Sequence, residues 1–277
     1  MSRYKDRRQY FEELAESSRA FFLDYAARGK ALDSSCRVLE IGCGEGGNLL
    51  PFAELGCQVT GTDLAAGKIE NARLFFEGIV NAEFFAENFI DGESLRGRSF
   101  DLIIIHDVIE HIEPEYKLEF MSKVRGLLAP DGLMFWAFPA WKMPFGGHQQ
   151  ICTSKWSRLP WLHLLPAKLY RHLLLARGEN PAQVEELMSI RRSRMSVESF
   201  EKLARSCSYG IVDRTLWLIN PHYRVKFGLR PLRLPFFLNI PWLRNFFCTS
   251  CFYLLKDYSS GEALSVAASV RFVAARR

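Results

Sequence analysis

Residues 37–64 read RVLEIGCGEGGNLLPFAELGCQVTGTDL, and this stretch decides the fold. An apolar run ends at Ile41 and a glycine cluster follows. After a helix-like segment, a second short apolar run stops at Asp63. Glycines let a ligand approach the backbone closely, and a carboxylate at the end of a second strand accepts hydrogen bonds from ribose hydroxyls. The stretch therefore predicts a strand, a helix and a second strand that bind a nucleotide, and it leaves the kind of nucleotide open.

The same alternation extends to both sides of this stretch. An amphipathic helix is expected before it, and helical periodicity separates the later apolar runs. The runs that predict strands cover residues 36–41, 57–63, 82–89, 102–105, 133–140, 211–219 and 246–256. Short, fully apolar strands that alternate with helices are typical of a parallel sheet covered on both faces. We therefore expect an α/β fold with a doubly wound, mostly parallel sheet, whose last two strands form an antiparallel edge hairpin.

The alternation breaks at Trp141, where a stretch rich in Trp, His, Leu, Arg and Pro begins. A helix from Ser196 to Gly210 resumes the pattern, with an imperfect capping box at Ser196 and Ser199. The intervening stretch is interpreted as an inserted, partly helical cap. The predicted parts are an N-terminal helix in residues 1–30, a nucleotide-binding domain in 31–140 and 196–257, the cap in 141–195 and a small polar tail in 258–277.

The composition of the 277 residues limits the classes of protein. A net charge of +5, with basic residues spread along the chain, does not by itself indicate nucleic acid. Seven cysteines at irregular spacing, including the pair Cys248 and Cys251, are interpreted as buried reduced thiols. The charged first residues do not resemble a signal peptide, and no stretch approaches the ~20 apolar residues of a membrane span. We expect a cytoplasmic protein, at most peripheral to a membrane.

Two nucleotides compete for the glycine cluster. Gly42, Gly44 and Gly47 match G-x-G-x-x-G, and Asp63 follows about 20 residues later, as in dinucleotide-binding proteins. The loop, however, carries no Lys or Arg to neutralise a phosphate. Glu40 would repel a pyrophosphate and attract an ammonium group. A ligand with a ribose, a positive centre and an amino-acid end, such as S-adenosylmethionine, fits better than NAD.

A second acidic segment supports this choice. His106, Asp107 and Glu110 follow the apolar run at residues 102–105, so the rim at this strand end is acidic and hydrogen-bonding rather than cationic. Several segments together resemble the class I S-adenosylmethionine-dependent methyltransferases, in the branch with small-molecule, quinone, lipid and glycan acceptors. The resemblance covers residues 31–139 and rests on VLEIGCGEGGN, VTGTDLAAGKIENAR, FFAENF, FDLIIIHDVIEHI and LLAPDGLMFWAFP. It implies a seven-stranded sheet with a reversed last strand.

The resemblance also implies cofactor roles. Glu40 and the first glycines would line the methionine part, Asp63 would hold the ribose, and Leu64 would pack on the adenine. Glu87 stands where an acid receives the adenine amino group, although Asp is more usual there, and Asn88 follows it. The expected cofactor residues are Glu40, Gly42, Cys43, Gly44, Gly46, Asp63, Leu64, Glu87, Asn88, His106 and Asp107.

Methyl transfer to oxygen would require a base. The acceptor attacks the sulfonium methyl in line, so positioning supplies much of the rate, and a hydroxyl acceptor must lose a proton. His148, which follows two glycines where the cap begins, is the leading candidate. His106 and His111 are the alternatives, and His111 is expected to open a helix, where a structural role is equally open. No metal site is expected.

The acceptor is interpreted as a small, lipid-linked or glycan-linked molecule. A nucleic-acid substrate is not expected, because the Asn-Pro-Pro-Tyr type of motif is absent after residue 105. The cap leans basic, which suits an anionic acceptor or an anionic membrane. RPLRLPFFLNIPWLRNFF, residues 230–247, adds arginines among aromatics and is either an interfacial patch or part of the core. An NAD-dependent oxidoreductase and a non-catalytic S-adenosylmethionine-binding module are the alternative functions.

Overall fold

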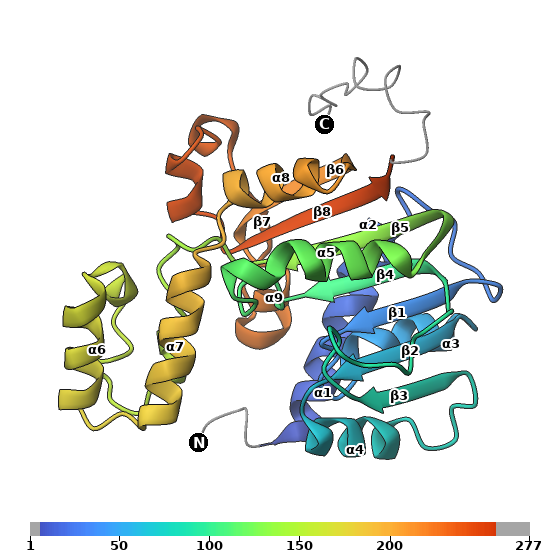
Figure 1. Ribbon diagram of the computed structural model, residues 1–277, viewed down its shortest axis with the longest axis horizontal. Coiled ribbons are helices and arrows are strands. Elements are labelled where there is room, and N and C mark those ends of the chain that lie inside the picture. Colours follow the sequence, from blue (N-terminus) through green and yellow to red (C-terminus); the bar gives the residue numbers. More distant parts are fainter. Residues whose placement is uncertain (1–5, 259–277) are drawn as a thin grey trace.

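The computed structural model describes residues 6–258, and its centre is one eight-stranded sheet (Figure 1). The strand order is β3-β2-β1-β4-β5-β8-β6-β7. The strands β3, β2, β1, β4 and β5 run parallel, and β8 runs antiparallel to both of its neighbours. The strands span Arg37–Ile41 (β1), Gln58–Asp63 (β2), Ala82–Ala86 (β3), Phe100–His106 (β4), Leu128–Phe138 (β5), Tyr209–Ile219 (β6), Leu232–Arg233 (β7) and Ser250–Asp257 (β8).

The predicted α/β fold and its reversed last strand are confirmed, but two details were wrong. The described residues form eight strands rather than seven, because the short β7 pairs with β6. The pair β6 and β8 is not an edge hairpin, since β8 lies between β5 and β6 and its side chains are buried from both sides. The antiparallel pairing of these two segments was predicted correctly.

Apolar side chains on both sides of the central strands explain the layers. Leu39 and Ile103 point to one face, which α5 and α8 cover, and Val38 and Leu102 point to the other, which α1 to α4 cover (Figure 1). Helices on both faces leave no polar side for the central strands, so the runs are apolar throughout. The helices span Arg7–Ser17 (α1), Leu23–Ala26 (α2), Leu50–Glu54 (α3), Ala66–Phe75 (α4), Lys117–Gly126 (α5), Ala167–Ala176 (α6), Pro181–Ser193 (α7), Val197–Ser206 (α8) and His222–Phe227 (α9).

The N-terminal helical segment packs directly on the glycine loop. A π-helical turn at Ser18–Phe22 joins α1 to α2, and the Ser18 hydroxyl donates a hydrogen bond of 2.7 Å to the backbone oxygen of Asn48. A Cβ atom at Gly47 would lie 2.5 Å from the backbone oxygen of Phe11. The third glycine of the sequence motif is therefore required by the packing of this helix, not by a ligand.

Several predicted element boundaries need correction. The helix α8 ends at Ser206, and Gly210 lies in β6 instead of ending the helix; the capping box of Ser196 and Ser199 is complete, because a serine hydroxyl replaces the usual carboxylate. The strand β5 begins at Leu128, earlier than the run predicted from residue 133, and its pairing with β4 shifts register between Phe100 and Leu102. His111 lies in a turn and does not open a helix; the next helical turn begins at Pro114.

Residues 141–195 carry α6 and α7 and lie at the carboxyl ends of the parallel strands (Figure 1). Six buried residues form a hydrophobic cluster of this segment's own: Cys152, Tyr170, Leu174, Val184, Leu187 and Met188. This agrees with an inserted cap, although the predicted domain boundaries stay predictions. The predicted tail covers residues 258–277, and all of it except Tyr258 lies outside the described residues. All seven cysteines are buried and unpaired, and no helix within residues 6–258 is long and apolar enough to cross a membrane.

Candidate active site

The glycine loop connects β1 to the ends of two other strands. The backbone N–H groups of Gly42 and Cys43 donate to the Thr62 oxygen at 2.7 and 2.9 Å, which ties the loop to β2. Gly42 has a φ of +74°, and a Cβ atom there would lie 2.5 Å from Cγ2 of Val108. Glycine at this position therefore allows close packing on the loop that follows β4, and the two predicted motifs meet here.

Asp63 is held in one orientation at the end of β2. Its Oδ2 accepts from the Gly44 N–H at 2.9 Å and its Oδ1 accepts from the Ala65 N–H at 2.9 Å. The Lys68 Nζ lies 3.8 Å from Oδ2. The neighbouring Leu64 is 76 % exposed, an unusual state for a leucine beside a glycine loop. A fixed carboxylate beside an open apolar surface suits a ribose with its attached base.

Glu40, which lies near the end of β1, is deeply buried at 1 % exposure. Its Oε1 accepts from Asn48 Nδ2 at 2.7 Å, and its Oε2 has no hydrogen-bond partner within the described residues. Burial raises the pKa of this carboxyl to about 8, and the Asn48 hydrogen bond opposes the shift. A buried carboxyl with an unused oxygen fits a cationic ligand group, which would favour its charged form.

Glu87 and Asn88 follow β3 and lie beside Asp63, whose backbone oxygen accepts from the Glu87 N–H at 3.1 Å. The Glu87 Oε2 accepts from the Ser94 N–H at 3.2 Å. The Asn88 side chain closes a local turn, since it accepts from the Ile90 N–H and donates to Asp91. Their position beside the β2 end agrees with the adenine roles predicted for them, which stay predictions.

His106 ends β4 and Asp107 follows it, and Asn48 connects His106 to Glu40. The Nδ1 of His106 lies 3.4 Å from Nδ2 of Asn48, and its ring packs edge-on against Phe22 at a centroid distance of 5.1 Å. The exposed Asp107 has a φ of +54°, and its Oδ2 lies 3.7 Å from Nε2 of His106. The N-terminal segment thus contacts the predicted methionine end of the site.

Three side chains from two separate regions of the sequence meet after β4: Glu110, His111 and His148. His148, which adopts a left-handed conformation with a φ of +56°, places its Nε2 3.8 Å from Oε1 of Glu110. The rings of His111 and His148 lie edge to face at 5.0 Å. Glu110 is 3 % exposed, and neither of its oxygens has a hydrogen-bond partner within residues 6–258. Both histidines were predicted as candidate bases, whereas Glu110 was predicted only as part of the acidic rim.

Burial gives this cluster its electrostatic character. It raises the pKa of Glu110 well above its usual range, and the nearby Asp107 adds to the rise. Burial lowers the pKa of His148 to about 4 and also lowers the pKa of His111. Neutral imidazoles beside a buried carboxyl can accept or hold a proton. The ligand atoms of the three residues lie within 4.8 Å of one another, so the same groups could also hold a metal ion, which the sequence analysis did not expect.

The basic residues of the cap serve mainly internal contacts. Arg191 is buried and donates to the backbone oxygen of His163, Arg192 pairs with Glu113 at 2.6 Å, and Arg171 pairs with Glu185 at 2.5 Å. Arg158 donates to the backbone oxygen of Cys152. These contacts weaken the cap's surplus charge as an argument for an anionic acceptor.

Comparisons with known proteins agree with this geometry. Residues 39–134 match the methyltransferase domain family. A ubiquinone biosynthesis O-methyltransferase from Chelativorans sp. strain BNC1 is 41% identical over 102 residues, which are 36% of this chain and 38% of that protein. One from Xanthomonas campestris is 34% identical over 114 residues, which are 41% of this chain and 46% of that protein. The chain thus spans less than half the length of these curated relatives.

Solved structures extend the likeness to most of the chain. Magnesium protoporphyrin IX methyltransferase from Synechocystis, solved with bound SAH, has a TM-score of 0.53 at 14% identity and covers 93% of this chain and 88% of its own. An S-adenosylmethionine-dependent methyltransferase from Clostridium acetobutylicum has a TM-score of 0.54 at 11% identity, over 87% of this chain and 91% of its own. The chain therefore has the fold of the class I S-adenosylmethionine-dependent methyltransferases. Within this fold, residues 39–134 are the part that matches the methyltransferase domain family, and the NAD-dependent oxidoreductase finds no support among these relatives.

Proposed function

We propose that this protein transfers the methyl group of S-adenosylmethionine to an oxygen atom of a small-molecule acceptor. The observation that carries the proposal is the arrangement along one sheet edge: the oriented Asp63, the buried Glu40 with its unused oxygen, and the cluster around His148. The match to the methyltransferase domain and the names of the two O-methyltransferase relatives support it.

Asp63, Leu64 and Glu40 would orient the cofactor. Asp63 accepts from the ribose hydroxyls, Leu64 covers the base, and Glu40 meets the positive charge of the methionine part. When bound, S-adenosylmethionine supplies an electrophilic methyl on a sulfonium. The Glu40 carboxylate favours this cation over a neutral or anionic ligand. Because Glu40 is buried, its charge interactions are stronger than they would be in water.

His148 would remove the acceptor's proton. Its neutral imidazole would accept the proton of the acceptor's hydroxyl, and the positive charge that the ring gains would lie beside Glu110. The Glu110 carboxyl, 3.8 Å away, would act on the ring by charge, because its ionised form stabilises a protonated imidazole. His111 packs against the His148 ring and limits its rotation.

The finer identity of the acceptor follows from the surroundings of the site. We propose a hydroxyl compound that is lipid-linked, because the sheet edge that carries the site also carries a large exposed apolar segment, described in the next subsection. An anionic or glycan-linked acceptor has less support, since the cap's arginines are engaged internally. We further propose that the protein acts in the cytoplasm, in peripheral contact with a membrane.

Binding and turnover are tested separately. Purified protein is titrated with S-adenosylmethionine, S-adenosylhomocysteine and NAD while the melting temperature is followed. A ligand at 100 times its Kd stabilises by about 2.7 kcal/mol, so the first two should raise the melting temperature and NAD should not. Transfer of labelled methyl to a panel of free and prenylated phenols then distinguishes an enzyme from a module that only binds. Stabilisation by NAD alone would overturn the proposal; binding without transfer to any phenol would favour the non-catalytic module.

A further inference from the structure

Residues 227–243 expose an unusual amount of apolar surface. Eight large hydrophobic side chains of this segment are exposed: Phe227, Leu229, Leu232, Phe236, Phe237, Ile240, Trp242 and Leu243. Phe236 is 89 % exposed and Trp242 is 72 % exposed, so the aromatics here do not pack in the core, which was one of the two interpretations of the sequence. Contiguous exposed apolar surface marks an interaction site more often than not.

The charged residues of this part of the sequence have a single sign. No Asp or Glu occurs between Arg214 and Lys256, whereas Arg224, Lys226, Arg230 and Arg233 lie next to the exposed residues. The side chains of Arg230 and Arg233 are exposed and form no ion pair within the part of the chain that the structure describes. Apolar side chains bordered by cations complement an anionic lipid bilayer, in which chains lie below charged headgroups.

Trp242 is presented by a strained turn. Its φ is +71° and its ψ is −48°, and the Leu243 N–H donates to the Pro241 oxygen at 2.9 Å, which closes a three-residue γ-turn. This hand of γ-turn is rare for a residue with a side chain, and such strain persists only where the surroundings enforce it. The turn leaves most of the Trp242 side chain in solvent instead of in the core.

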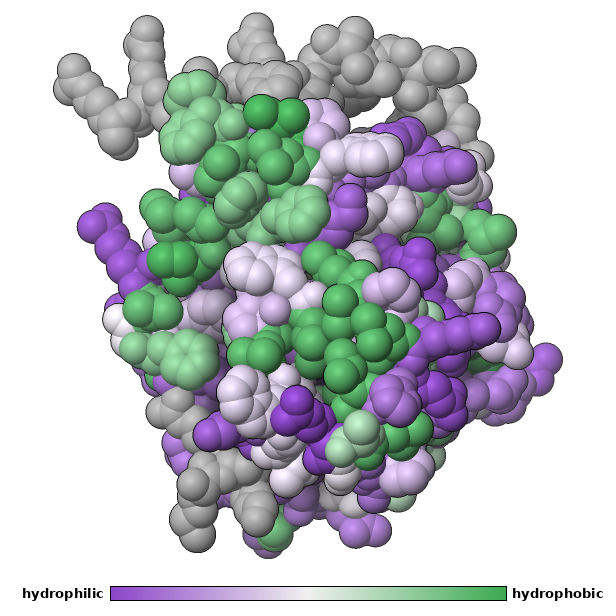
Figure 2. All heavy atoms as spheres, turned by 90° about the vertical axis from the view of Figure 1, so that its left-hand side faces the viewer, coloured by the Kyte–Doolittle hydropathy of each residue, from purple (hydrophilic) through white to green (hydrophobic). Residues whose placement is uncertain are grey.

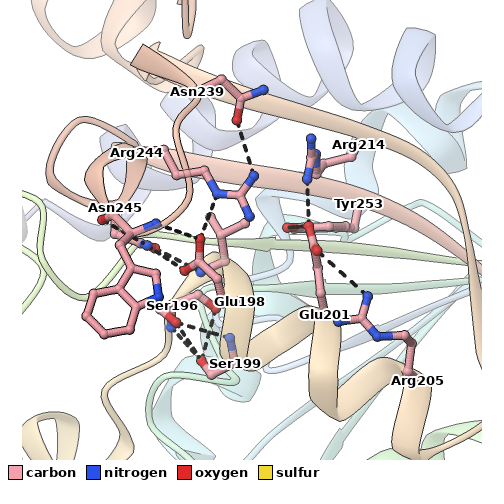
Figure 3. Close-up of polar contacts among 12 residues, drawn as sticks. Ser196, Glu198, Ser199, Glu201, Arg205, Arg214, Asn239, Arg244, Asn245 and Tyr253 are labelled. Atoms are coloured by element: carbon pink, nitrogen blue, oxygen red, sulfur yellow. Dashed lines mark hydrogen bonds and ion pairs between the residues drawn. The ribbon is translucent and has the colours of Figure 1, made fainter. Parts of the chain in front are cut away.

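Glu198 enforces this turn from the start of α8 (Figure 3). Its Oε1 accepts from the Trp242 N–H at 3.1 Å and from Arg244 Nε at 2.8 Å, and its Oε2 accepts from Asn245 Nδ2 at 2.6 Å. Arg244 in turn donates to the Asn239 side chain. The turn at residues 239–245 is therefore fixed to the start of α8 through Glu198.

The segment lies on the same edge of the molecule as the site. In Figure 1 the segment includes the loop that precedes β8 in the sequence, and it projects on the side to which the parallel strands point. Figure 2 shows hydrophobic residues gathered in the upper part of that face. The Nζ of Lys142, at the start of the cap, lies 5.2 Å from the Trp242 ring. A surface docked through Trp242 would therefore lie next to the cap.

We propose that residues 229–243 dock this protein on anionic lipid bilayers. Phe236, Phe237, Ile240 and Trp242 enter the boundary between headgroups and acyl chains, and Arg230 and Arg233 contact the headgroups. The inference specifies the membrane contact of the proposed function, but it does not depend on methyl transfer or on the identity of the acceptor.

Vesicle flotation of the full chain tests the proposal, with phosphatidylcholine vesicles and with vesicles that contain about one third phosphatidylglycerol. We expect binding to the anionic vesicles that decreases as salt is raised, and much weaker binding to the neutral ones. The double variant Phe236→Ser/Trp242→Ser should bind at least tenfold more weakly, because two large apolar side chains no longer leave water. Arg230→Gln/Arg233→Gln should reduce the salt dependence.

Leu74→Ser is the matched control, because Leu74 is 62 % exposed on α4, away from the segment. It should bind vesicles like the wild type. Each variant must melt at the wild-type temperature and keep its stabilisation by S-adenosylmethionine, a readout that tests the proposed function independently. Absence of binding to anionic vesicles would overturn the inference, as would equal loss in the Leu74 control. So would self-association without lipid that the double variant abolishes, since it would identify a second copy as the occupant.

Discussion

Replacing Glu40 by Gln should make the free protein more stable and bind S-adenosylmethionine more weakly. The carboxyl has a folded-state pKa of about 8 and an ordinary value of 4.5. A pKa that is higher in the folded state gives stability at low pH that is lost as the pH rises from 4.5 to 8. The amide does not titrate, so the variant should not lose this stability.

The structure sets the size of the effect. At pH 7 the free energy of unfolding of the wild type is about 3 kcal/mol lower than at pH 4.5, because each pH unit above 4.5 removes about 1.4 kcal/mol. The amide keeps the oxygen that accepts from Asn48, and one of its two N–H groups replaces the O–H of the protonated acid. The second N–H is a new buried donor, which offsets part of this gain. The melting temperature at pH 7 should rise by roughly 6 to 10 °C, and the difference should vanish near pH 4.5.

Ligand binding should change in the opposite direction. The cationic cofactor favours the carboxylate, so its binding should release a proton and its affinity should rise with pH between 6 and 7.5 in the wild type. The Gln variant loses a charged partner worth about 1.5 to 3 kcal/mol, so affinity should fall by one to two orders of magnitude and the pH dependence should disappear. Calorimetric melts and titrations at several pH values measure both effects. Equal stability together with unchanged affinity would refute the role given to Glu40.

Three further predictions concern the same edge of the sheet. Asp63→Asn should weaken S-adenosylmethionine binding at least tenfold by calorimetry, because one of its oxygens now becomes a donor that faces a backbone N–H; wild-type affinity would contradict the ribose role. Gly42→Ala should lower the free energy of unfolding, measured in urea, by about 1 to 3 kcal/mol, through a clash with Val108 and through backbone strain at a positive φ. Adding Val108→Ala should relieve the clash and leave the backbone strain. His148→Ala should lower kcat by one to two orders of magnitude and leave cofactor affinity nearly intact. Because the base form of His148 persists down to a pH of about 4, kcat at saturating cofactor should show no histidine-like loss near pH 6.5.

Local chemistry accounts for what the sequence could predict. The roles of the glycines, of Asp63 and of the short apolar runs could be predicted, because periodicity and turn requirements act within a few residues. In the structure, the Asp63 carboxylate at the end of β2 binds the glycine loop after β1. The complete capping box at Ser196 and the placement of Gly210 in a strand depend on small differences at helix ends, where patterns are least informative.

Contacts between distant segments could not be predicted in this way. Glu110 and His148 are 38 positions apart and meet only because a left-handed backbone at His148 turns the cap back over the loop after β4. Likewise, the apolar composition of residues 230–247 fitted both a core segment and a surface. The difference depends on Glu198, which lies outside that segment and holds the strained turn at Trp242.

The position of the exposed segment has a consequence for access to the site. A lipid-linked hydroxyl must leave the bilayer over a short distance, since each methylene moved into water costs about 0.8 kcal/mol. The cap begins beside β5, its Lys142 contacts Trp242, and its His148 reaches Glu110 after β4. The cap therefore connects the proposed membrane contact to the proposed base within seven residues. If the acceptor is lipid-linked as proposed, a base near the start of the cap and an exposed apolar segment beside that start would keep the distance from bilayer to His148 short, which is the arrangement that this cost favours.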